Sequence, residues 1–292
     1  MSASAAERWA KARSFHHSSF SAQRIADERE ETVTVVLPAR ECAATVGEIV
    51  TGLLELREAG AIDEVLVVDA ASADDTEGVA ERAGARVLQE AALMPGVGPV
   101  LGKGDAMWRS LSAVESDLVC FLDADSVGFT AHFATGLLGP LVCEPRAAFV
   151  KGFYRRPFVH GAIEVPDGGG RVNHLMARPA LALFYPELAS VRQPLAGEVA
   201  ARRELLARVP FATGYGVEVA MLIDVWRLLG LEAIAQVDLG EHRNRHQPLS
   251  ALTPMASTVL ATIAARLERE GRLWGVAGGP VERPPLASVT VA

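Results

Sequence analysis

Residues 32–69 read TVTVVLPARECAATVGEIVTGLLELREAGAIDEVLVVD, and this stretch decides the fold class. The mostly apolar runs at residues 32–37 and 64–69 predict strands that are buried on both faces of a sheet. Between them, apolar residues recur at helical spacing over residues 46–54, and Gly60 marks the expected end of that helix. A strand, a helix and a second strand in this order predict a parallel βαβ unit.

The same alternation continues downstream of this unit. A helix capped by Asp74 or Asp75, a short strand at 86–88, a helix over 105–114 and a buried strand LVCFL at 118–122 extend the pattern. Residues 31–126 are therefore expected to form a nucleotide-binding α/β half. Ligands of such sheets bind at the carboxyl ends of the strands, where Asp69, Asp123 and Asp125 are expected to lie.

The second half of the chain is less regular. Patterns predict strands at 148–153 and 233–238, helices at 175–183 and 218–229, and a closing helix at 249–267. The expected division is a polar N-terminal arm over 1–30, the α/β half over 31–126, a second half with the closing helix over 127–270, and a Gly/Pro-rich tail over 271–292.

Composition excludes several classes of protein. The chain has 292 residues, of which 50% are hydrophobic and 22% charged, so it is globular rather than disordered. A net charge of −8 argues against general binding to nucleic acid or anionic membranes. Three cysteines, with Cys120 in an apolar run, fit a reducing compartment. Without a bilayer-length apolar stretch or a signal-peptide pattern, a cytoplasmic protein is expected.

The triplet Asp123-Ala124-Asp125 directly follows the strand at 118–122. Two carboxylates this close repel each other, so a cation that neutralises them would stabilise the pair. Mg²⁺ takes few protein ligands and completes its shell with phosphates and water, which favours a metal site facing a diphosphate. The alternative is that the two aspartates cap a turn.

Glycine-rich segments with charged residues provide further candidate ligands. In Gly102-Lys103-Gly104, before a helix, backbone N–H groups and an ammonium can approach phosphate, although a solvated lysine in a loop is equally consistent. KGFYRRP at 151–157 and DGGGR at 167–171 concentrate cations, and Arg binds phosphate or carboxylate bidentately; a solvated charge run is the alternative.

Two later segments carry potential ligands and carboxylates. EHRNRHQ at 241–247 places two His and two Arg after a strand, which favours a ligand loop over an isolated structural histidine. Glu198 and Glu218 each follow a glycine-containing turn, and the simpler role for Glu218 is to interact with the dipole of the helix that it opens. Hydrolase-elbow, zinc-finger and dinucleotide signatures are absent from the sequence.

The segments VVLPA, VVDAASADDT, GKGDAMWRS and FLDAD together resemble the front half of a GT-A glycosyltransferase that uses a nucleotide sugar. KGFYRRP, GGGRV, QPLAGE, PFATGYGVE and AIAQVDLG in the back half are similar to the actinobacterial glucosyl-3-phosphoglycerate synthases and the related mannosyl-3-phosphoglycerate synthase. The resemblance covers residues from about 32 to 268. It implies an α/β fold of GT-A type, with a mostly parallel nucleotide-binding sheet flanked by helices and an acceptor-binding part in the C-terminal half.

The resemblance also implies an activity. This is a retaining transfer of glucose from UDP-glucose to the 2-hydroxyl of 3-phosphoglycerate, with Mg²⁺ or Mn²⁺ as cofactor. A homodimer is implied, and the product would be a precursor of a compatible solute or polysaccharide. The expected binding partners are therefore small anions, in contrast to nucleic acid or membrane.

Site residues follow from motif positions in the same resemblance. It implies Glu218 and Asp125 as catalytic residues, and Asp125 as metal ligand together with Asn244 or His242. The implied donor-binding residues are Pro38, Ala39, Glu41, Asp69, Ala70, Lys103, Asp123, Ala124, Leu195 and Tyr215. The implied acceptor-binding residues are Gly170, Arg171, Val172, Asn173 and His246.

The sequence departs from the family pattern at three implied ligand positions. Cys42 replaces the acidic residue that would contact the nucleoside, and Ala70 lacks the hydroxyl that the family has near the uridine. Asn244 stands where the family has a metal-ligand His. A relaxed donor choice, including GDP-mannose, is therefore an alternative. Two more remote alternatives are a nucleotidyltransferase and a nucleotide-sugar-binding protein without turnover.

Overall fold

This computed structural model contains one sheet of eight strands, to which both halves of the chain contribute. The structure describes residues 4–160, 163–165, 168–243, 248–273 and 281–289. The strands are β1 (Ser14–His16), β2 (Val33–Ala39), β3 (Glu64–Asp69), β4 (Arg86–Gln89), β5 (Leu118–Phe121), β6 (Phe149–Arg155), β9 (Val199–Arg202) and β11 (Ile234–Glu241). Their order across the sheet is β1-β11-β6-β9-β5-β2-β3-β4. Only β9 is antiparallel to its neighbours among these eight strands.

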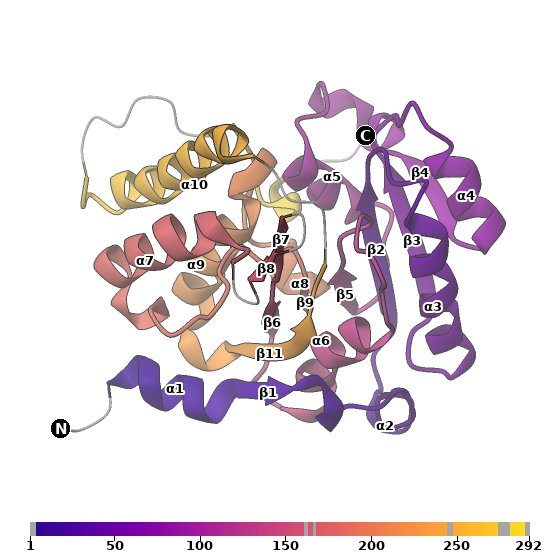
Figure 1. Ribbon diagram of the computed structural model, residues 1–292, viewed down its shortest axis with the longest axis horizontal. Helices are drawn as coiled ribbons and strands as arrows, with labels where there is room; N and C mark the ends of the chain where they lie inside the picture. The colour runs from indigo at the N-terminus through magenta and orange to yellow at the C-terminus, as the bar shows by residue number, and fades with distance from the viewer. Residues whose placement is uncertain (1–3, 161–162, 166–167, 244–247, 274–280, 290–292) are drawn as a thin grey trace.

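Helices cover both faces of this sheet (Figure 1). They are α1 (Ala5–Arg13), α2 (Ala22–Glu28), α3 (Val46–Glu58), α4 (Thr76–Ala83), α5 (Lys103–Ser110), α6 (His132–Cys143), α7 (Arg178–Phe184), α8 (Arg203–Leu206), α9 (Val217–Leu229) and α10 (Leu249–Arg269). Two small antiparallel pairs lie outside this sheet. They are β7 (Phe158–His160) with β8 (Ile163–Val165), and β10 (Phe211–Ala212) with β12 (Glu282–Arg283). In the described part of the chain, no helix is long and apolar enough to cross a membrane.

Alternating apolar side chains on the strands create two hydrophobic layers. In β3, Val65 and Val67 pack into one cluster while Leu66 and Val68 pack into the other, as the period of two of a strand requires. Helices α3, α4 and α6 complete the first cluster, and α5, α7, α9 and α10 complete the second. Burial on both faces explains why the strand sequences read as continuous apolar runs.

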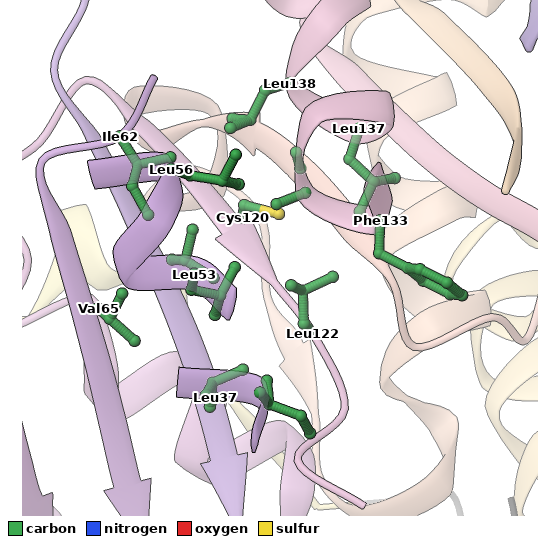
Figure 2. Packing of buried hydrophobic residues seen from close by; sticks show 14 of the residues in the cluster. Leu37, Leu53, Leu56, Ile62, Val65, Cys120, Leu122, Phe133, Leu137 and Leu138 are labelled. Carbon is green, nitrogen blue, oxygen red and sulfur yellow. The ribbon is translucent and has the colours of Figure 1, made fainter. Parts of the chain in front are cut away.

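The first cluster also holds Cys120, which was expected to be a small core residue. This side chain is fully buried in β5. Figure 2 shows it between Leu53 and Leu56 of α3 and Leu137 of α6. The structure records Cys120 as a free cysteine, as it does the other two cysteines.

Most predicted elements are present with shifted ends, and some elements were not predicted. The helix expected over 105–114 begins earlier, at Lys103, because Gly102 adopts a φ of 87° that ends the preceding loop. Residues 1–30, expected to be a polar arm, contain α1, β1 and α2, and β1 adds a strand beside β11. Strand β9 and helix α6 had no separate prediction. The sheet crosses the expected boundary at residue 126, since β5 pairs with β9.

Candidate active site

A pocket of about 250 Å³ opens where β5 and β6 end, at the edge of the sheet where ligands were expected. Ten of the residues assigned from the sequence line it: Lys103, Asp123, Asp125, Gly170, Arg171, Val172, Asn173, Leu195, Tyr215 and Glu218. They come from segments far apart in the chain, so the fold brings together what the motifs only suggested. The predicted positions Asn244 and His246 lie outside the described residues.

Lys103 is the cation at the centre of this pocket. Its Nζ lies 2.6 Å from Asp123 Oδ1 and 3.1 Å from Glu218 Oε1. Burial opposes the charge on Lys103, but the two carboxylates outweigh it and raise the pKa of the ammonium. The pKa of Asp123 is lowered, because Lys103 more than offsets the burial of that carboxyl. Lys103 and Asp123 are therefore both charged at neutral pH, in a partly desolvated site.

Two glycines allow this ion pair to form. A Cβ at Gly197 would lie 2.5 Å from both Asp123 Oδ1 and Lys103 Nζ, so a side chain there would displace the pair. A Cβ at Gly104 would lie 2.0 Å from the carbonyl oxygen of Ala212, so α5 can start where it does only with glycine at that position. These two glycines are thus needed because other groups approach the backbone closely, and not because the chain must be flexible there.

Asp125 is the carboxylate in this pocket that fits a cation. Its side chain is accessible from the pocket, and among the described residues it has no ion-pair partner and no hydrogen-bond donor. Burial by the surrounding chain and the neighbouring Asp123 raise its pKa, and the opposing effects of Lys103 and His242 are smaller. No three His, Cys, Asp or Glu side chains converge among the described residues. One carboxylate nevertheless suits Mg²⁺ or Mn²⁺ when phosphates supply further ligands.

His242, the alternative metal ligand, lies in a buried network below the pocket. Its Nε2 is 2.8 Å from Ser126 Oγ and 3.3 Å from Glu198 Oε1, and its ring stacks on Tyr154 at 4.6 Å between centroids. Tyr154 donates a hydrogen bond of 2.8 Å to Glu198. Nε2 is therefore already engaged within the protein, and the role of His242 as a metal ligand stays a prediction.

Lys151 belongs to a cationic segment that was expected to supply positive charge for the substrates, but it was not in the predicted set of site residues. It is 1% exposed, and its Nζ donates a 2.8 Å hydrogen bond to the carbonyl of Ala196, beside Gly197. Burial lowers its pKa to about 8, although Glu218 and Glu198 counteract the effect. Lys151 thus supplies positive charge beneath the carboxylates of the pocket and holds the chain that contacts Lys103.

The predicted acceptor-binding residues Gly170, Arg171, Val172 and Asn173 line the same pocket. Gly169 donates a hydrogen bond to the carbonyl of Arg156, and a Cβ on it would lie 2.6 Å from that residue. The guanidinium of Arg171 lies 5.2 Å from the centroid of the Phe158 ring. Asn173 is buried in the π-helical turn just before α7, and its Oδ1 lacks a hydrogen-bond partner in the described structure. An unpartnered buried oxygen next to arginines is consistent with a polar ligand at this wall.

The remaining predicted donor-binding residues lie at the ends of β2 and β3 and in the loops that follow β2, β3 and β5, outside the lining of the pocket. Asp69 is buried at the end of β3, where its carboxylate accepts hydrogen bonds from Ser72 and Gln89. Glu41 has a φ of 55° and its carboxylate accepts the backbone N–H of Ala73, so it joins two loops. Residues of this group that do not line the pocket are Pro38, Ala39, Glu41, Asp69, Ala70 and Ala124.

Several residues that line the pocket were absent from the predicted set. Tyr154, Arg156, Gly197 and Gln193 belong to the quoted segments KGFYRRP and QPLAGE, so the signal existed without an assignment to each residue. The apolar residues of α10 had no signal beyond helical periodicity. These are Leu252, Met255 and Val259.

Comparisons with known proteins agree with this geometry. Residues 34–128 match the family model described as Glycosyl transferase family 2. The glucosyl-3-phosphoglycerate synthase of Mycolicibacterium smegmatis is 45% identical over 89% of this chain and 86% of its own length. The enzyme of the same name from Petrotoga mobilis is 40% identical over 89% of this chain and 82% of its own length.

Solved structures are equally similar. The crystal structure of mannosyl-3-phosphoglycerate synthase from Rubrobacter xylanophilus is 44% identical, covers 99% of both chains and superposes with a TM-score of 0.90. Glucosyl-3-phosphoglycerate synthase from Mycobacterium tuberculosis, solved with Mn²⁺, UDP-glucose and phosphoglyceric acid, is 40% identical, with a TM-score of 0.81 and coverage of 92% and 95%. The expected α/β fold of GT-A type is confirmed. The chain belongs to the glucosyl-3-phosphoglycerate synthase family of glycosyltransferases.

Proposed function

We propose that this protein transfers glucose from UDP-glucose to the 2-hydroxyl of 3-phosphoglycerate, with retention of configuration, and so makes glucosyl-3-phosphoglycerate. The observation that carries the proposal is the convergence of Lys103, Asp123, Asp125, Glu218 and Arg171 in one pocket. Relatives named for this reaction, one of them solved with UDP-glucose and phosphoglyceric acid, support it.

The donor diphosphate is proposed to bind between Lys103 and Asp125. Asp125 would hold Mg²⁺ or Mn²⁺, and the bound ion would neutralise charge on the departing diphosphate. Lys103 starts α5, so its ammonium and the free backbone N–H groups of that first turn can both donate to phosphate oxygens. Asp123 keeps the ammonium in place through their 2.6 Å contact, and by motif position it also contacts the ribose.

Glu218 is proposed to lie beside the transferred sugar. Its carboxylate is buried in the first turn of α9 and forms an ion pair with Lys103. A fixed negative charge there would stabilise positive charge that develops at the anomeric carbon as the diphosphate leaves. Tyr215 and Leu195 complete the sugar-binding wall in this proposal.

The acceptor is proposed to bind at the wall formed by Gly170, Arg171, Val172 and Asn173. The carboxylate and phosphate of 3-phosphoglycerate need charged donors, and an Arg guanidinium can bind either group bidentately. Arg156 lines the same pocket and adds a second guanidinium. His246 remains a predicted contact of the acceptor.

Mannosyl transfer from GDP-mannose is the second candidate. A mannosyl-3-phosphoglycerate synthase is as similar as the glucosyl enzymes and covers 99% of the chain. Cys42 also replaces the acidic residue expected near the nucleoside, and its buried thiol has a pKa raised to about 11, mainly by burial. A neutral thiol lacks the carboxylate that would accept hydrogen bonds from one base in preference to another.

A donor panel tests these two functions. The protein is incubated with Mn²⁺, 3-phosphoglycerate and one of UDP-glucose, GDP-glucose, UDP-mannose or GDP-mannose, and each released nucleotide is quantified. The proposal predicts the fastest release of UDP from UDP-glucose, dependent on 3-phosphoglycerate. Faster release of GDP from GDP-mannose would support the second candidate. Nucleotide binding without release would show a protein that binds nucleotide sugars without turnover.

The assembly and setting of the protein are also part of the proposal. A homodimer is supported by exposed leucines on α10, on α7 and on the π-helical turn just before α7, which provide apolar surface on the C-terminal half: Leu175, Leu183, Leu249 and Leu260. Three free cysteines support a cytoplasmic protein. The product is proposed to serve as a precursor of a compatible solute or polysaccharide. Light scattering of the eluted protein tests the dimer, since a monomeric mass would exclude it.

A further inference from the structure

A short C-terminal segment, residues 281–284, joins the two loops that lead into the candidate active site. Strand β12 in this segment pairs with β10, and the carbonyl of Val281 accepts the backbone N–H of Thr213 at 3.1 Å. The carbonyl of Pro284 accepts the indole N–H of Trp108 in α5 at 2.9 Å. The segment therefore contacts α5, which begins at Lys103, and the strand that leads to Glu218.

Arg283 makes the most extensive contacts of this segment. Its guanidinium is 8% exposed and forms a bidentate ion pair with Asp105, with Nε 2.6 Å from Oδ1 and Nη2 2.9 Å from Oδ2. The same group donates to the carbonyls of Val97 at 2.6 Å and Pro99 at 2.8 Å. One side chain thus connects the tail to α5 and to the loop that precedes it.

Asp105 is the partner that links Arg283 to the active site. It is fully buried in the first turn of α5, two residues after Lys103. It also accepts hydrogen bonds from Arg109 Nε at 3.0 Å and from the backbone N–H of Leu101 at 2.9 Å. The loop before Lys103, the helix after it and the C-terminal segment therefore meet at one carboxylate.

The two turns that carry the active-site charges pack directly against each other. Gly102 lies against Gly214, since a Cβ on Gly102 would be 3.7 Å from the Cα of Gly214. Gly104 packs on the carbonyl of Ala212, as described above. The side chain of Val217 also packs against Gly104. Residues 281–284 contact both turns and add a restraint from outside the pocket.

We propose that Arg283 is a positioning residue for the transfer reaction, which through Asp105 fixes Lys103 at its distance from Glu218 and Asp123. Without Arg283, the carbonyl of Val97 loses its donor, the carbonyl of Pro99 keeps only the 3.2 Å hydrogen bond from Arg109, and Asp105 keeps one of its two arginines. Of the two arginines that bind carbonyls of the loop before α5, only Arg109 then remains, and the Lys103 ammonium no longer faces the donor diphosphate in one geometry. The inference rests on the proposed function for the identity of the donor.

Variants of Arg283 test this role. Arg283→Ala is expected to lower kcat/KM by about 10- to 100-fold, chiefly through a higher KM for UDP-glucose, because small displacements of a positioned group have effects of that size. The KM for 3-phosphoglycerate should change less than about twofold, since Arg171 and Asn173 belong to a segment outside α5 and the loop before it. Arg283→Lys should recover part of the loss, because an ammonium can pair with Asp105 but cannot span both carbonyls.

Arg269→Ala is the matched control. Arg269 pairs with Glu282 in the same segment but is half exposed and reaches neither α5 nor its loop. Arg269→Ala should therefore leave the KM values for UDP-glucose and for 3-phosphoglycerate unchanged. Activities are compared well below the melting temperature of each variant, so that loss of folded protein does not enter.

Hydrogen exchange gives a second readout that does not need turnover. Arg283→Ala should speed exchange in residues 94–104, and it should weaken binding of UDP with Mn²⁺ measured by calorimetry. Equal KM values for Arg283→Ala and Arg269→Ala, or unchanged exchange in residues 94–104, would overturn the inference. If Arg283→Ala does not fold, an unchanged donor KM in Arg283→Lys would overturn it. A wild-type protein without transfer activity would instead overturn the proposed function, and exchange would still decide the role of Arg283.

Discussion

Gly197 shows how closely single residues are fitted in this active site. A Cβ there would meet the Lys103–Asp123 ion pair at 2.5 Å, and the backbone conformation itself would accept alanine. We therefore expect Gly197→Ala to separate the two charges and to reduce kcat by about 100-fold without unfolding the protein. The matched control is Gly96→Ala, since a Cβ at Gly96 meets nothing within 4 Å. Equal kcat values for the two variants would contradict the account.

Asp125 determines the metal dependence in this account. Asp125→Asn keeps the shape of the side chain but removes the charge that would hold the ion, so the Mn²⁺ concentration for half-maximal activity should rise by at least about tenfold. A metal titration of the initial rate measures this. The exposed Asp75, which pairs with Arg82, provides the control as Asp75→Asn. An unchanged Mn²⁺ requirement in Asp125→Asn would show that another residue holds the metal.

The sequence predicted residues of this site whose chemistry is expressed in short motifs. Lys103 between two glycines and the aspartates after β5 were identified in this way, and the structure places them in one pocket. The part that could not be predicted depends on packing between distant segments. Tyr154 and Glu198 are 44 residues apart, and their hydrogen bond becomes visible only once β6 and β9 pair.

At the scale of elements, the 3₁₀ turn η2 (Glu90–Ala92) brings a buried acid to α5. Glu90 is 1% exposed, its Oε1 lacks a hydrogen-bond partner in the described structure, and burial and then Asp105 raise its pKa to about 7. Above about pH 4.5 the unfolded chain loses this proton more readily than the folded chain does. The contribution of Glu90 to the free energy of unfolding therefore becomes less favourable as pH rises to 7.

Glu90→Gln tests this dependence. The variant has no proton to lose, so its free energy of unfolding should gain on that of the wild type between pH 5 and pH 8, by on the order of 1–3 kcal/mol. Urea unfolding at both pH values measures the gain. A difference between variant and wild type that is the same at pH 5 and pH 8 would show that Glu90 keeps an ordinary pKa.

Elements were predictable where periodicity was strong. The strands β2, β3 and β5 read as apolar runs because helices cover both of their faces. Strand β9 was missed because its sequence, VAAR, has one β-branched residue and two alanines, which do not form the apolar run that marks β5. Its antiparallel direction follows from the long excursion through α7, which no local sequence pattern encodes.

At the scale of the whole molecule, the N-terminal segment is part of the core. Trp9 of α1 is 2% exposed in the second cluster, and its indole N–H donates to the carbonyl of Ile234 at 2.9 Å. Trp9→Ala should cost about 3–5 kcal/mol of unfolding free energy, as for other large buried aromatics. Lys11→Ala, on the exposed side of the same helix, is the control. A cost below about 1 kcal/mol for Trp9→Ala would show that the segment does not contribute to the core.

The net charge of −8 describes the surface of the whole molecule better than it describes the pocket. Composition alone argued against large anionic partners, but it could not show that Lys103, Arg156 and Arg171 line one cavity. Local cation density within motifs pointed to small anions, and the fold concentrates those motifs at one edge of the sheet.

Identification of the product tests the central claim most directly. The purified protein is incubated with UDP-glucose, 3-phosphoglycerate and Mn²⁺, and the phosphorylated products are separated and identified by mass spectrometry and by the anomeric coupling in NMR spectra. The account predicts glucosyl-3-phosphoglycerate with an α-linked glucose, formed in amounts equal to the UDP released. A β-linked product, or UDP release without any glycosylated phosphoglycerate, would contradict it.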